Sequence, residues 1–178
     1  MRRGYYWGAP GVLVSGLVWC AAACVALAGE EQLAVYVLLI GGMFIFPGGV
    51  LLLKLIGHPG KHSPTNPLNG LAMEGTVWLL AGCWMAFGVQ TLRIEWFFPV
   101  MLLTIGARYL SFQTLYGLRL YWILGALLCA AGFALGWAMA PVAAGAVCGA
   151  LTELFFAAVL FVQAKREPVD GSGDPASS

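Results

Sequence analysis

The stretch that decides the fold is LYWILGALLCAAGFALGWAMAPVAAGAVCGALTELFFAAVLF, residues 120–161. No charged residue lies between Arg119 and Glu153. A hydrocarbon core of about 30 Å takes about 20 apolar residues per helix, so this stretch is too long for one crossing. The glycine and proline of residues 136–141 favour a tight turn in its middle. We therefore predict two transmembrane helices, over 120–139 and 142–161.

The rest of the chain has the same character. Of its 178 residues, 61% are hydrophobic and 10% are charged, and the mean hydropathy is +0.85. Soluble domains carry charge on roughly a quarter of their residues, so this composition excludes one, and it equally excludes a disordered chain or a nucleic-acid binder. We expect an all-α polytopic bundle of six spans in a single transmembrane domain, residues 1–166, followed by a disordered cytoplasmic tail, 167–178. The four further apolar runs cover 11–28, 33–55, 71–91 and 96–115.

The first run allows a second interpretation. Arg2 and Arg3, an apolar segment and then Ala26-Leu27-Ala28 resemble a secretory signal with its cleavage site. Cleavage would leave five spans and an external N-terminus. The run is long for the apolar region of a signal peptide, which favours six spans.

Basic residues predict the orientation, because Lys and Arg resist translocation more than acidic residues do. With a cytoplasmic N-terminus, eight basic residues lie at or towards the inner side and Arg93 alone lies outside. We therefore predict a multi-pass protein of the cell (inner) membrane with both termini cytoplasmic. The eight inner residues are Arg2, Arg3, Lys54, Lys61, Arg108, Arg119, Lys165 and Arg166.

Small residues at four-residue spacing indicate close helix packing, which in lipid is the main source of helix association. Gly145 and Gly149 form one such pair in the sixth span, and Ala126, Ala130, Ala134 and Ala138 form a longer stripe in the fifth. These faces are primarily structural, and they also offer a route to a homo-oligomer. Pro47 predicts a kink or break in the second span, since proline removes a helical hydrogen bond.

Glu153 is the most informative single residue. It lies about 17 Å into the sixth span at 1.5 Å per residue, too deep for its short side chain to reach water. An ionised carboxylate there must be protonated, paired or facing a wet cavity. Arg108 lies about 18 Å into the fourth span, at nearly the same depth. We expect an ion pair between the two, with snorkelling of Arg108 to the phosphate level as the alternative.

Other polar residues extend this candidate site. Thr104, Arg108 and Ser111 share one face of the fourth span, while Tyr109, Gln113 and Tyr116 share another. Glu74 compensates the dipole of the third helix or stands at the cytoplasmic mouth of a polar cavity. The predicted intramembrane site consists of Glu153, Arg108, Glu74, Thr104, Tyr109 and Gln113.

The chain offers no cofactor or metal site by its sequence. Its five cysteines lie inside apolar runs without the spacing of metal ligands. His58 and His62 flank Lys61 in the longest polar loop, where no carboxylate or cysteine completes a ligand set. We expect neither a cofactor nor a nucleic-acid partner; membrane lipids are the expected surroundings.

Short motifs occur between roughly residues 38 and 125: Phe46-Pro47, Leu53-Lys54-Leu55-Ile56-Gly57, Asn66-Pro67-Leu68, and Gly106-Ala107-Arg108-Tyr109-Leu110 with Phe112 and Leu115-Tyr116. In this order they resemble a family of small bacterial membrane proteins of unknown function. The resemblance implies a six-span topology. It also implies histidine as often as arginine at position 108, which favours a polar intramembrane role there over snorkelling. It implies no chemistry.

Three functional classes follow from these residues. The first is a small-solute or proton-linked channel or transporter with a polar path lined by Glu153, Arg108 and Glu74. The second, equally favoured, is an accessory, sensor or lipid-binding bundle in which Arg108 and Glu153 form a structural ion pair. An intramembrane enzyme is the least favoured, because no nucleophile with its base, HExxH helix or phosphate loop is present.

Overall fold

The computed structural model describes residues 8–55 and 68–166; over these ranges it consists of helices joined by short turns, with no strand, which agrees with the all-α class that the sequence predicts. The predicted tail, Arg2, Arg3, His58, Lys61 and His62 lie outside the described residues. Each apolar run contains one helix, except that the second run contains two. The helices are α1 (Ala9–Leu27), α2 (Glu31–Met43), α3 (Ile45–Leu55), α4 (Leu68–Gln90), the 3-10 helix η2 (Ile94–Trp96), α5 (Phe97–Tyr116), α6 (Arg119–Trp137) and α7 (Val142–Arg166).

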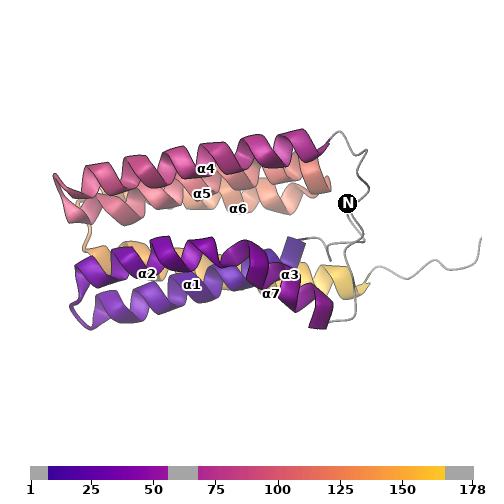
Figure 1. The fold of residues 1–178 in the computed structure, drawn as a ribbon, viewed down its shortest axis with the longest axis horizontal. Coiled ribbons are helices and arrows are strands. Elements are labelled where there is room, and N and C mark those ends of the chain that lie inside the picture. Colours follow the sequence, from indigo (N-terminus) through magenta and orange to yellow (C-terminus); the bar gives the residue numbers. More distant parts are fainter. Residues whose placement is uncertain (1–7, 56–67, 167–178) are drawn as a thin grey trace, which may run out of the picture.

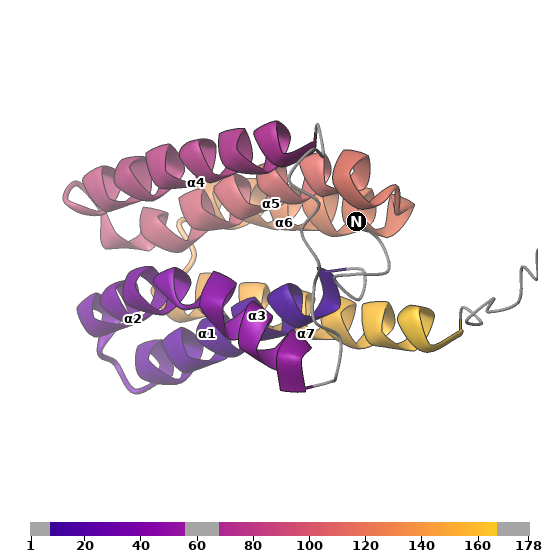
Figure 2. The same cartoon turned by 45° about the vertical axis from the view of Figure 1, so that its right-hand side comes forward.

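The helices form two layers that lie side by side along the long axis of the molecule (Figure 1). One layer contains α4, α5 and α6, and the other contains α1, α2, α3 and α7, as the turned view also shows (Figure 2). Successive long helices run in opposite directions, with the α2 and α3 pair acting as one of them. α7 contacts α1 in its own layer and also α5 and α6 in the other, so it joins the layers.

The turn expected between the two C-terminal helices lies at residues 138–141. α6 ends at Trp137 and α7 begins at Val142. Met139 takes the left-handed backbone conformation, with φ of 51°, which reverses the chain direction. The charge-free stretch is therefore folded into two antiparallel helices.

The break expected at Pro47 lies three residues earlier, at Phe44. The axes of α2 and α3 differ by 53° across this residue. Pro47 then falls in the first turn of α3, where its missing N–H leaves no helical hydrogen bond unmade. Proline thus sets where the new helix begins.

Three helices of the described chain are long and apolar enough to cross a membrane: α1, α6 and α7. The bent pair α2 and α3 makes a fourth if it counts as one span. Large apolar side chains also point outward all round the bundle, which is typical of a membrane protein and not of a soluble one. Examples are Leu17, Ile40, Trp84, Trp122 and Phe155, whose exposed fractions range from 55% to 81%.

The core lies where the two layers meet. Trp19 of α1 and Phe97 and Phe98 of α5 are completely buried there. The rings of Trp19 and Phe98 lie 5.7 Å apart between centroids, and Phe97 meets Phe98 edge to face at 5.1 Å. This aromatic contact joins α1 to α5 near the end of the bundle where α5 begins.

Gly145 and Gly149 pack inside the chain. A Cβ atom on Gly145 would lie 2.6 Å from Cβ of Phe98, and one on Gly149 would overlap the Trp19 ring. This pair therefore serves the contacts of α7 within one bundle and is covered. The alanine stripe of α6 is instead exposed at all four positions: Ala126, Ala130, Ala134 and Ala138.

α5 and α6 touch backbone to backbone where two glycines meet. A Cβ atom on Gly125 would lie 2.6 Å from the carbonyl oxygen of Gly106, and one on Gly106 would lie 2.8 Å from that of Gly125. Neither carbonyl can rotate away, because each belongs to a helix. Small residues are what allow this approach.

We predict that Gly125→Ala lowers the free energy of unfolding by about 2 kcal/mol, because the added methyl group forces α5 and α6 apart. Unfolding of the purified protein in mild detergent measures it. Gly88→Ala is the matched control, since nothing lies within 4 Å of a Cβ atom at Gly88. Equal stability of the two variants would contradict the close contact.

Candidate functional site

The carboxyl group of Glu153 is enclosed by protein. The residue lies near the middle of α7 and its exposed fraction is 0%. Neither carboxyl oxygen has a hydrogen-bond partner among the described residues. A buried polar group without a partner costs roughly 1–3 kcal/mol, and an ionised one costs more. The fold therefore accommodates Glu153 at a cost in stability.

Two hydroxyl groups face this carboxyl group from the neighbouring helices. Ser15 of α1 and Tyr109 of α5 lie close enough to interact with it electrostatically, although neither hydroxyl group forms a hydrogen bond with it. Both are almost completely buried, with exposed fractions of 3% and 5%. Ser15 also faces Tyr109. We call Ser15, Tyr109 and Glu153 the central polar cluster; it gathers one residue from each of α1, α5 and α7.

The register of α1 against α7 explains why these side chains meet. Ser15 and Trp19 lie four residues apart on one face of α1, and Gly149 and Glu153 lie four apart on one face of α7. Because the helices are antiparallel, Trp19 covers Gly149 while Ser15 faces Glu153. The indole nitrogen of Trp19 is buried as well and has no hydrogen-bond partner in the described chain.

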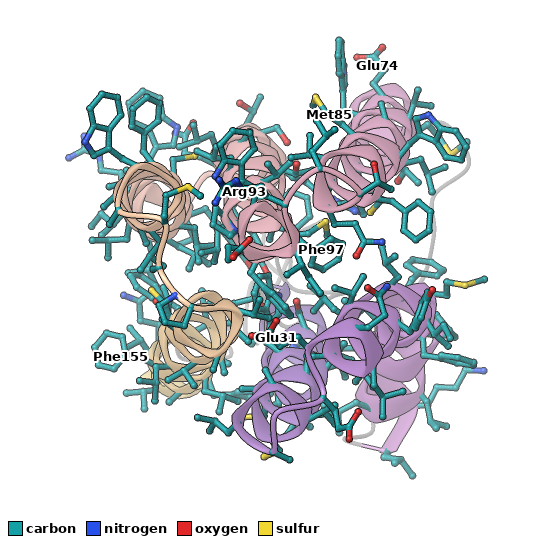
Figure 3. The ribbon with its side chains drawn as sticks, turned by 90° about the vertical axis from the view of Figure 1, so that its left-hand side faces the viewer. Glu31, Glu74, Met85, Arg93, Phe97 and Phe155 are labelled. Carbon is teal, nitrogen blue, oxygen red and sulfur yellow. The ribbon has the colours of Figure 1, made fainter. Side chains whose placement is uncertain are left out.

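Aromatic rings surround the central polar cluster on its α5 and α6 side. Tyr109 stacks on Tyr121 at 5.9 Å between centroids and meets Phe112 edge to face at 5.5 Å. Towards the other end of the bundle, Phe97 lies between the two layers (Figure 3). Tyr121 and Phe112 thus enclose the Tyr109 ring on the α5 and α6 side of the cluster.

The structure does not bear out the expected ion pair between Arg108 and Glu153 as a hydrogen-bonded contact. Neither oxygen of Glu153 accepts a hydrogen bond from the arginine. Arg108 is half buried and instead lines a groove between α4 and α5, with its guanidinium group 5.6 Å from the centre of the Phe112 ring. Each residue of a helix turns by about 100°, so Tyr109 faces α7 and Arg108 does not. The two residues lie at similar depths in their helices, but similar depth does not make them neighbours.

The groove between α4 and α5 collects the other predicted residues. It has a volume of ≈ 440 Å³ and is lined by Thr104, Arg108 and Ser111 of α5 and by Glu74 of α4, among others. The predicted common face of the three α5 residues is therefore present. Glu74 is exposed and points away from the bundle (Figure 3). It lies beyond the first turn of α4, so compensation of the helix dipole does not explain it.

The predicted residues thus divide between two places. Tyr109 and Glu153 belong to the central polar cluster, whereas Glu74, Thr104 and Arg108 line the groove. Gln113 is half buried on α5 and is not among the residues that line the groove. The sequence interpretation missed Ser15 and Trp19. A serine four residues before a tryptophan, in a helix that is otherwise apolar, was the available signal.

No metal centre is formed by the described residues. No three histidine, cysteine, aspartate or glutamate side chains come together in the two described ranges. The central polar cluster offers one carboxyl group and two hydroxyl groups. This set can bind or release a proton.

The family of the chain is shown by a match over most of its length. A family described as "Family of unknown function (DUF7010)" matches residues 1–163. The chain belongs to the DUF7010 family. No curated protein and no solved structure matches it. DUF7010 has no assigned activity, so the function of the central polar cluster has to be argued from its own geometry.

We predict that Glu153→Met leaves the free energy of unfolding unchanged or raises it by about 1 kcal/mol. Methionine has a similar length and volume but no polar atom that needs a partner. Denaturant unfolding in detergent micelles measures the change. Leu160→Ala, at another buried position of α7, should lower stability by about 2–5 kcal/mol in the same assay. If Glu153→Met lowered the free energy of unfolding as much as Leu160→Ala, the carboxyl group would stabilise the fold, which would contradict the prediction.

Proposed function

We propose that this member of the DUF7010 family is a six-span protein of the cell membrane with both termini cytoplasmic. α4 and α5 have 23 and 20 residues, as long as the helices that meet the criterion for a span. They also lie along the same long axis as the other helices, and each runs in the direction opposite to that of the helix before it (Figure 1). Polar residues lower the mean hydropathy of these two helices, and several of those residues line the groove between them.

Charge supports this orientation. Lys54 at the end of α3 and Arg119 at the start of α6 lie at the end of the bundle where α1 begins. Arg93 lies at the other end, together with Glu30, Glu31 and Glu95. The positive-inside rule makes the first end cytoplasmic. Burial of Ser15 and Trp19 against α5 and α7 also favours retention of α1 over its removal as a signal peptide.

The second part of the proposal is that the protein is a proton-linked channel or transporter for a small solute. One observation carries it: a fully buried carboxyl group without a hydrogen-bond partner in the described chain, in the middle of a membrane-spanning helix. Such a residue is expensive to bury, and ionisable residues within membrane spans mark pathways and proton relays by default. Since Glu153 accepts no hydrogen bond from Arg108, a structural ion pair between the two residues loses its main support.

The mechanism uses the two protonation states of Glu153. The neutral acid fits the dry contact between α1, α5 and α7. Loss of the proton leaves a carboxylate that requires water or a cation, so the surrounding helices must separate or admit water. Proton binding and release then shift the bundle between two arrangements. The hydroxyl groups of Ser15 and Tyr109 lie next to the carboxyl group, where they can pass the proton on to or from it.

The second candidate function is a lipid-binding, sensor or accessory bundle. The observation that favours it is the open groove between α4 and α5, with Arg108 and Glu74 in its lining. Self-association through small-residue faces would use the exposed alanine stripe of α6, since Gly145 and Gly149 are covered. The two candidates differ in whether Glu153 controls a flux.

Proton flux into liposomes tests the proposal directly. We predict that the reconstituted protein dissipates an imposed pH gradient faster than protein-free liposomes, as read from an enclosed pH-sensitive dye. Glu153→Gln should return the rate to the protein-free level, because the amide has the same shape and cannot release a proton. Thermal unfolding should confirm that the variant is folded.

Glu31→Gln is the matched control, because Glu31 is exposed at the start of α2. It should keep the flux of the unchanged protein. Equal rates for the unchanged protein and Glu153→Gln would refute a proton path through Glu153.

Topology is tested separately by cysteine labelling. In a background whose five cysteines are replaced, we predict that Thr91→Cys reacts with a membrane-impermeant thiol reagent from outside intact cells. Arg119→Cys should react only after the cells are opened, because α5 separates the two positions. Both positions are exposed in the structure. Reaction of both from the same side would contradict a crossing by α5.

A further inference from the structure

The groove between α4 and α5 presents opposite charges in a face of the bundle that is open to the surroundings. Arg108 contributes a guanidinium group, and Glu74 contributes a carboxylate at the outer edge of the groove, where its side chain points away from the bundle (Figure 3). The hydroxyl groups of Ser111 and Thr104 donate hydrogen bonds to backbone carbonyl oxygens of their own helix, at 2.6 Å to Arg108 and 2.8 Å to Val100. Their oxygen atoms therefore keep lone pairs that accept hydrogen bonds. The groove thus offers one strong donor and several acceptors.

The helix register orders these groups along the membrane normal. Gly75 lies opposite Ser111, and Gly82 lies opposite Thr104. Because α4 and α5 are antiparallel, Trp78 is level with Arg108, and Glu74 is about one helical turn, roughly 5 Å, closer to the start of α4. The sequence of groups from the membrane surface inward is Glu74, then Ser111, then Arg108, then the Thr104 contact.

The groove narrows in the same direction. A Cβ atom on Gly82 would overlap the Thr104 side chain, so the helices touch there. A Cβ atom on Gly75 would find its nearest neighbour, Oγ of Ser111, only at 4.0 Å. The space is therefore widest near the surface, and its inner part is lined by apolar side chains such as Leu79 and Met85.

We propose that this groove binds one zwitterionic glycerophospholipid with a primary ammonium group, of the phosphatidylethanolamine type. Its ammonium group would meet Glu74 and the acceptor oxygen of Ser111, and its phosphate would meet Arg108. The acyl chains then continue past Leu79 and Met85 towards the membrane centre. The order ammonium, phosphate, acyl chain is the order in which the lining presents acceptor, donor and apolar surface.

Charge complementarity selects this lipid over others. A lipid with only a negative headgroup would match Arg108 and be repelled by Glu74. A choline headgroup has no N–H to donate to the carboxylate or the hydroxyl oxygen. Pockets between transmembrane helices on the cytoplasmic side are known sites for lipid headgroups, and ≈ 440 Å³ lies within the range of small-ligand pockets. The inference rests on α4 and α5 lying in the membrane, as proposed above, and is independent of Glu153.

Native mass spectrometry of the protein, released from detergent after exchange into phosphatidylethanolamine, tests the inference. We expect one bound lipid per chain, with phosphatidylglycerol and phosphatidylcholine each binding at least tenfold more weakly. Arg108→Gln and Glu74→Gln should each weaken binding of phosphatidylethanolamine about tenfold. Gly75→Leu should abolish it by filling the wide end of the groove, while its Cβ atom meets nothing closer than 4.0 Å.

Arg119→Gln and Glu31→Gln are the matched controls, since both remove an exposed charge away from the groove. They should bind within twofold of the unchanged protein, and so should Glu153→Gln, which separates this site from the proton path. Equal binding of all three lipids, or unchanged binding by the groove variants, would overturn the proposal. The proposal would also be overturned if the protein were a dimer without bound lipid and the groove variants were monomeric. A second copy of the chain would then occupy the groove.

Discussion

Burial of one carboxyl group constrains the whole arrangement of this bundle. Glu153 lies at the contact of α1, α5 and α7, and neither of its oxygens has a hydrogen-bond partner in the described chain. Hydrocarbon cannot solvate a charge. The packing of the three helices therefore requires that this carboxyl group be uncharged, or that it be supplied with water or a counter-charge. Gly149 lets the Trp19 ring close over α7 one turn away, which brings Ser15 opposite the carboxyl group.

α5 is the helix that gives the protein two polar places instead of one. Its consecutive residues Arg108 and Tyr109 point to different neighbours, the first into the groove with α4 and the second towards Glu153. A backbone shift of α5 would therefore move both side chains together.

The helical segments could be predicted from the sequence, because the length of an apolar run and the place of a turn are local properties. The 120–161 stretch divides where its glycine and proline indicate, and the second run breaks near Pro47. The partner of Glu153 could not be predicted. Residue spacing gives depth, which Arg108 and Glu153 share, but it does not give the rotation of one helix against the next. That rotation is decided by contacts such as Gly106 against Gly125, between residues far apart in the chain. Ser15 was missed for the same reason.

Infrared spectroscopy of the carboxyl group of Glu153 in the reconstituted protein tests the central claim most directly. The stretching band of a protonated carboxyl group should be present at neutral pH and should disappear in Glu153→Gln. These results would follow from a neutral acid enclosed by α1, α5 and α7. A carboxylate band at neutral pH that is lost in Glu153→Gln would show that the group is ionised. That result would contradict the enclosed central polar cluster.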